Sequence, residues 1–207
     1  MSRPGRVAVV VAAGCALGAV AAGCGTYSAV RPADTLRAGR VELAAGLAAS
    51  QLGEANTVLH GAIGVTDRVE VLGQNEVWNS FVEGRVGLLH SDQDPLGLAL
   101  GVGAGYAVTL VSALGEEVQD GGDSGAAVTV SASVGKRWGQ VELTLAHRTF
   151  FMTAGFFAAS TRIGVRAHIG DNFGLLLEGG ATIHAPTSSP SLAIGIGEAT
   201  TGVFVGF

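Results

Sequence analysis

The sequence predicts an all-β protein, an antiparallel transmembrane β-barrel preceded by a signal peptide. Apolar residues alternate with small or polar residues along most of the chain, which is the period of a β-strand. Mean hydropathy is high at +0.44, yet no apolar stretch after the first 25 residues could form a spanning helix. Glycine supplies 33 of 207 residues, and only 14% of residues are charged. Together these features favour a membrane protein built from strands.

The first residues have the pattern of an export signal. Arg3 and Arg6 precede an apolar run over residues 7–22, which is too short to span a membrane as a helix. The run ends at Ala21-Ala22-Gly23-Cys24, which resembles the bacterial lipobox, where the cysteine is lipidated and becomes the first mature residue. We therefore expect a signal peptide over 1–23 and a periplasmic tether over 24–39 that starts at lipidated Cys24. The alternative is an ordinary signal peptide with an incidental cysteine.

The barrel is expected over residues 40–207. With a periplasmic N-terminus, alternately short and long connections give ten strands, and eight or twelve remain alternatives. An even number returns the C-terminus to the periplasm. The apolar phase changes between Ile196 and Val203, which predicts a bulge or extra turn near residues 198–201. The expected strands cover 40–49, 57–65, 68–74, 79–90, 96–111, 124–136, 139–150, 156–169, 173–184 and 197–207.

The side-chain alternation indicates which face meets lipid. In the fifth expected strand, Leu98 and Val102 lie on one face and Gly101, Gly103 and Gly105 on the other. Leucine and valine suit a lipid-facing surface, and glycines suit a crowded interior. A soluble lipocalin-like barrel has the same period with its apolar face inward. The glycine-, alanine- and serine-rich opposite face has too few charges for a water-facing wall, so we favour the membrane barrel.

The chain ends in a strand whose last residues Val203, Val205 and Phe207 share one face. This ending resembles the assembly signal of Gram-negative outer-membrane β-barrels, and residues 64–71 resemble their hairpins. The resemblance implies the cell outer membrane, contact with outer-membrane lipids, and handling by the barrel-assembly and lipoprotein-sorting machineries. Gly25 lacks the aspartate that retains similar lipoproteins in the inner membrane, which agrees with this location. The expected aromatic belts are Trp138, Phe173 and Phe207 on the periplasmic side and Trp78, Phe151 and Phe157 on the outer side.

The mid-strand charges that we assign to the inward face comprise four glutamates and four arginines. A balanced set in a narrow lumen favours a salt-bridged plug, because a buried charge must be paired. The alternative is a small anion-preferring pore that uses Arg148, Arg162 and Arg166. The predicted lumen charge network is Glu42, Glu83, Arg85, Glu142, Arg148, Arg162, Arg166 and Glu178.

Nothing in the sequence matches a catalytic, phosphate-binding or zinc-binding motif. His147 and His184 are the candidates for a rim enzyme, but no motif joins them to an acid. A net charge of −5 without a basic cluster gives no support for nucleic-acid binding. We therefore expect no enzyme, cofactor or metal site.

The predicted function is that of a small outer-membrane β-barrel lipoprotein with a largely plugged lumen. Its role would be structural or surface-interacting, with outer loops that contact an extracellular ligand. The alternatives are a narrow pore for small solutes and a soluble periplasmic lipocalin-like lipoprotein.

Overall fold

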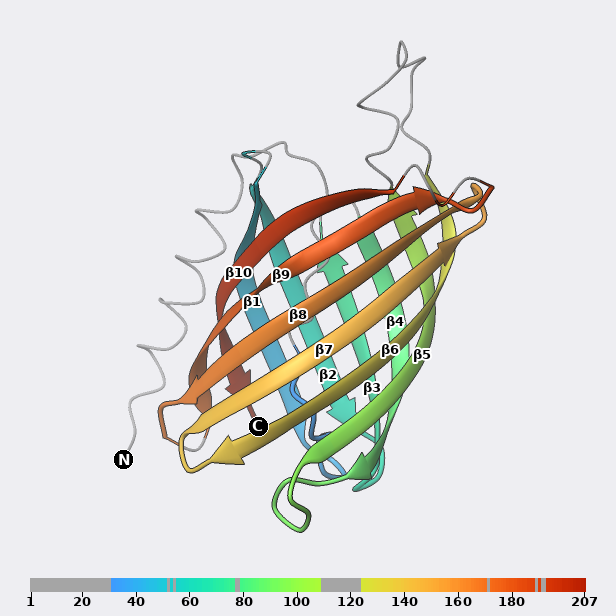
Figure 1. The fold of residues 1–207 in the computed structure, drawn as a ribbon. Helices are drawn as coiled ribbons and strands as arrows, with labels where there is room; N and C mark the ends of the chain where they lie inside the picture. Colours follow the sequence, from blue (N-terminus) through green and yellow to red (C-terminus); the bar gives the residue numbers. More distant parts are fainter. Residues whose placement is uncertain are drawn as a thin grey trace.

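The computed structural model describes residues 31–207 except 52, 54, 77–78, 109–123, 171, 189 and 191–192. The predicted signal peptide, Cys24 and Trp78 lie outside the described residues. The described chain is built from ten strands (Figure 1). They are β1 Val41–Ser50, β2 Ala55–Gly64, β3 Val69–Glu76, β4 Asn79–Leu89, β5 Gly97–Val108, β6 Ser124–Trp138, β7 Val141–Met152, β8 Phe156–His168, β9 Phe173–Pro186 and β10 Ile194–Gly206.

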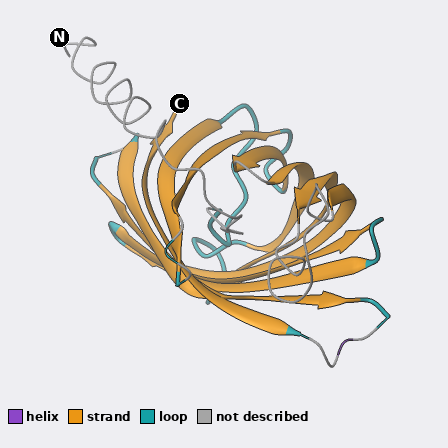
Figure 2. Cartoon of the chain, turned by 90° about the horizontal axis from the view of Figure 1, so that it is seen from above, coloured by secondary structure: helices purple, strands orange, loops and turns teal. Residues whose placement is uncertain are grey.

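The ten strands form one closed antiparallel barrel in which each strand pairs with its neighbours in sequence. β1 closes the ring by pairing with both β2 and β10, with Glu42 opposite Gly206 at one end and Ser50 opposite Glu198 at the other. Seen from above, the strands enclose a lumen (Figure 2). The predicted all-β antiparallel barrel and its ten strands are confirmed.

Every strand begins and ends within three residues of its predicted bounds. The short connections lie at one end of the barrel, at 65–68, 90–96, 139–140 and 169–172, and the C-terminus lies at the same end. Gly139 has a φ of +58°, which a residue with a side chain rarely adopts, so it allows the two-residue turn between β6 and β7. We refer to this as the short-turn end and to the opposite one as the loop end.

The bulge predicted near residues 198–201 is wrong. β10 pairs with β1 and β9 in continuous register through this region. Ile196 is buried and points into the lumen, as Phe204 does. The apolar phase changes because β10 places apolar side chains inside the barrel, while its pleat stays regular. The described register shift lies in β4, between Gly87 and Leu89.

The outer surface of the barrel is apolar. Outward positions carry large exposed side chains such as Val102 (63% exposed), Leu177 (60%) and Ile163 (58%). Of the expected aromatic belts, Trp138 and Phe207 are exposed at the short-turn end, and Phe151 is exposed toward the loop end. Within the part of the chain that the structure describes, no helix is long and apolar enough to cross a bilayer. An apolar band around a polar interior is the surface that a lipid environment requires.

The inner surface is crowded, as the glycine positions predicted. A Cβ atom on Gly101 would lie 2.5 Å from both Glu83 Oε1 and Ser131 Oγ. The neighbouring inward glycine, Gly103, is enclosed by Val82 and Thr129 in the same way. Outward Gly84 meets its nearest heavy atom only at 4.0 Å. The inward glycines therefore make room for long charged side chains from adjacent strands.

Candidate functional site in the barrel lumen

The lumen is the candidate site because the charged strand residues converge there. All eight residues of the predicted network are buried, with 0–6% of each exposed. Successive side chains of a strand point to opposite faces of the barrel wall. Because these side chains are buried, they point into the lumen. The set is Glu42, Glu83, Arg85, Glu142, Arg148, Arg162, Arg166 and Glu178.

Glu83 on β4 lies at the centre of one cluster. Its carboxylate accepts hydrogen bonds from Arg148 Nε at 3.2 Å and Ser131 Oγ at 2.7 Å. Arg85 Nε lies 3.9 Å from the same carboxylate. The Arg148 guanidinium also lies over the Phe81 ring, 4.4 Å from its centroid, so it gains a cation–π contact. Strands β4, β6 and β7 are thus joined across the lumen.

Arg162 on β8 lies at the centre of a second cluster. It forms a salt bridge with Glu198 on β10. Its guanidinium also donates to Thr182 Oγ1 and Ser160 Oγ, both at 2.9 Å. All four side chains are buried. Glu198 is absent from the predicted network, because a bulge in β10 would have turned its side chain away from the lumen.

A third cluster lies nearer the short-turn end. Arg166 Nη2 donates to Glu42 Oε1 at 2.7 Å, and its guanidinium carbon lies 3.8 Å from the centroid of the Phe204 ring. His168 Nε2 lies 3.6 Å from Glu142 Oε2. The three arginines suggested for an anion-preferring pore, Arg148, Arg162 and Arg166, therefore each face a glutamate.

The segment before β1 enters the lumen, and we call residues 31–36 the N-terminal plug. Arg31 is 3% exposed. It donates two hydrogen bonds to Glu70, at 3.1 and 2.6 Å, and a third to Glu42 at 2.7 Å. Arg85 Nη1 donates to Glu70 at 2.6 Å, and Arg85 Nη2 donates to the Pro32 carbonyl at 2.8 Å. The plug is therefore held by charge-assisted hydrogen bonds, the stronger kind.

Further contacts hold the plug at the short-turn end. Asp34 accepts a hydrogen bond from the Ser91 backbone N–H at 2.9 Å. Ser91 is itself held by Lys136 Nζ, which donates to the Ser91 carbonyl at 2.8 Å. Just beyond the plug, the Ala38 backbone N–H donates to Asp67 at 3.1 Å. The chain thus enters the lumen between two short turns.

The position of the plug differs from the periplasmic tether that we expected over residues 24–39. Residues 31–36 lie inside the barrel, and only the part from Arg37 to Arg40 is exposed at the short-turn end. Arg31 was therefore missed as a lumen charge, and Glu70 and Glu76 on the short strand β3 were missed as well. The available signal was a single arginine beside proline, Arg31-Pro32, which specifies a non-regular segment but gives no indication of where it lies.

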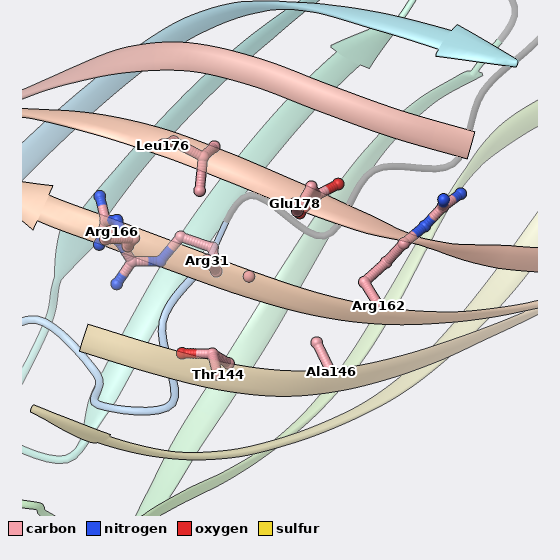
Figure 3. Close-up of a pocket in the computed structure, with 8 residues that line it drawn as sticks. Arg31, Thr144, Ala146, Arg162, Arg166, Leu176 and Glu178 are labelled. Carbon is pink, nitrogen blue, oxygen red and sulfur yellow. The ribbon is translucent and has the colours of Figure 1, made fainter. Parts of the chain in front are cut away.

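Two small cavities lie among the described lumen residues. One cavity lies between β7, β8 and β9, is lined by Thr144, Arg162 and Glu178 among others, and has a volume of about 10 Å³. Figure 3 shows Arg31 and Arg166 at one end of this cavity and Arg162 at the other. A second cavity of about 10 Å³ is lined by Arg85 and Arg148 among others. Each has room for about one water molecule, and Arg31 lines both.

The two candidate rim histidines lie on opposite faces of the barrel wall. His184 is 1% exposed and points inward, whereas His147 is exposed on the outside and hydrogen-bonds to Thr161 and Thr149. They cannot share one substrate. Among the described residues, no group of three metal-binding side chains comes together.

No family model and no curated protein matches this chain. A search of solved structures finds a loop-deletion mutant of OmpT, an outer membrane protein of Vibrio cholerae, with 7% identity, a TM-score of 0.33 and coverage of 81% of this chain and 98% of that one. It also finds Neisserial surface protein A, with 12% identity, a TM-score of 0.19 and coverage of 80% and 94%.

Proposed function

We propose that the protein is a small outer-membrane β-barrel lipoprotein with a structural or surface-interaction role and a closed lumen. The observation that carries this proposal is the combination of an apolar exterior with a lumen filled by paired charges and by the chain's own N-terminal plug. The proposal assigns no catalytic role, because the lumen residues serve one another as partners.

The exterior supports insertion into a bilayer. A soluble lipocalin-like barrel would need its apolar stripe inside, whereas exposed Val102, Leu177 and Ile163 place it outside. The lumen supports closure, since it is filled by paired side chains and by the N-terminal plug, and the two cavities described above each have room for about one water molecule. Interaction with a partner would then fall to the outer loops.

Heat-modifiable migration tests this proposal. The outer-membrane fraction is run on SDS gels with and without boiling, because a closed barrel resists SDS until it is heated. We expect the unboiled protein to run as a folded band that boiling converts to a band at a different position. In planar-bilayer recordings the same protein should carry no measurable current. A single band under both conditions would contradict the barrel, and steady conductance would contradict the closed lumen.

The lipid anchor at Cys24 is a separate part of the proposal. The Ala-Ala-Gly-Cys sequence over residues 21–24 supports it, and Gly25 supports sorting to the outer membrane. Labelling with radioactive palmitate should mark the native protein and leave Cys24→Ser unmarked, with Cys15→Ser labelled as strongly as the native protein. Equal labelling of native protein and Cys24→Ser would rule out this anchor.

A further inference from the structure

We infer that the N-terminal plug is removable and that its withdrawal opens a narrow pore that prefers cations. This inference rests on the proposed function, since it requires the same lipid-embedded barrel. It assigns residues 31–36 the role of a built-in closure and assigns the lumen a conducting state for small inorganic cations.

The first step is that the plug is not part of the barrel wall. Its residues belong to no strand, and the ring of ten strands closes through β1 and β10 without them. The plug is attached to the wall by side chains of the strands, chiefly Glu42 and Glu70, which bind Arg31, and Arg85, which donates to the Pro32 carbonyl. Withdrawal would therefore leave the hydrogen-bonded ladder of the barrel intact.

The strands supply another arginine for each of the two carboxylates that Arg31 binds. Glu42 is also bound by Arg166, and Glu70 is also bound by Arg85. Loss of Arg31 would not leave either carboxylate without a cation. This matters because an unpaired buried charge would be strongly destabilising.

The plug also occupies space in the lumen. Arg31 lines both lumen cavities, one bordered by β7–β9 and the other bordered by β4, β6 and β7. Its side chain therefore borders both cavities. Withdrawal of the plug would join these cavities and free the volume of six residues.

The described strands carry more buried glutamates than buried arginines. Among the described strand residues, the buried arginines are Arg85, Arg148, Arg162 and Arg166. The buried glutamates are Glu42, Glu70, Glu76, Glu83, Glu142, Glu178 and Glu198. Without the plug, four cationic side chains therefore face seven anionic ones. An excess of carboxylates along a narrow passage selects for cations.

The test is single-channel recording of the full mature chain in planar bilayers. Arg31→Ala is the main variant, and Arg37→Ala is the matched control, because Arg37 pairs with Asp92 in the exposed part of the same segment. We expect Arg31→Ala to open at least tenfold more often than the native protein, and Arg37→Ala to remain as silent as the native protein. In a KCl gradient, the reversal potential of the open state should show K⁺ permeating better than Cl⁻.

Each other outcome overturns the inference. Arg31→Ala that shifts on heating and stays silent shows that the plug is a fixed part of the fold. Equal opening of Arg37→Ala shows that plug docking is not the cause, and preference for chloride overturns the assigned selectivity. If Arg31→Ala does not fold, Asp34→Ala, which removes the contact with Ser91, decides between the same outcomes. Native protein that does not shift on heating would instead contradict the proposed function.

Discussion

At the scale of single residues, the lumen is held by charges whose partners come from other strands. Glu83 on β4 is the clearest case, because it faces Arg148 on β7 and accepts a hydrogen bond from Ser131 on β6. Such a pair is costly to break, since removal of one partner leaves the other charge in a desolvated site.

Glu83→Gln should therefore destabilise the barrel by about 3 kcal/mol, the cost of removing one partner of a buried ion pair. The measurement is urea-induced unfolding in lipid vesicles, followed by tryptophan fluorescence. Asp92→Asn is the matched control: it breaks an exposed pair with Arg37 and should change the free energy of unfolding by less than about 1 kcal/mol. Similar losses for the two variants would argue against a desolvated lumen.

Inward glycines belong to the same scale. Gly101→Ala should lower the free energy of unfolding by about 1–3 kcal/mol, since its methyl group would overlap Glu83 and Ser131. Gly84→Ala on the outward face has open space and should be neutral or slightly stabilising. The temperature at which the folded band disappears from SDS gels reports both. Equal midpoints for the two variants would contradict the packed interior.

At the scale of elements, the strands can be predicted from the sequence, whereas the partners of individual charged side chains cannot. Alternation over residues such as Leu98, Gly101 and Val102 is a local property, so the sequence predicts the ten strands and the eight inward charges of the predicted network. The pairing of Arg162 with Glu198 depends on strand register and on the parity of β10. Ile196 points inward against the apolar pattern, and that single residue suggested a bulge that the strand does not have.

The N-terminal plug shows a second limit of the sequence. Arg31 lies in no strand, and hence no periodicity indicates which way its side chain points. Its place is set by Glu70, which lies 39 residues away in the chain. A non-regular segment is positioned by such distant contacts. The composition of this segment does not reveal them, and it predicted only a periplasmic tether.

The outward phase of β5 gives a prediction at the element scale. Val102 lies near the middle of this strand and is 63% exposed. Val102→Arg should cost about 2–4 kcal/mol, the penalty for a cation on the lipid face near the bilayer midplane. Val102→Leu should fold as the native protein does. The folded fraction in vesicles measures both, and efficient folding of Val102→Arg would place Val102 away from lipid.

At the scale of the whole molecule, the fold reverses the arrangement of a soluble protein. Charges such as Arg162 and Glu83 are among the most buried side chains, whereas Val102 and Leu177 are among the most exposed. In water this arrangement would expose a continuous apolar band, which drives association. In a bilayer the same band is solvated by lipid, and the closed ring leaves no strand edge unpaired.

The most direct test of this account is fluorescence quenching of Val102→Trp in a background that carries Trp78→Phe and Trp138→Phe. The protein is folded into vesicles and exposed either to lipids brominated along their acyl chains or to aqueous iodide. If residue 102 faces lipid, the brominated lipids should quench its fluorescence strongly and iodide should quench it almost not at all. Strong quenching by iodide with none by the brominated lipids would contradict the membrane barrel and place the apolar face in water.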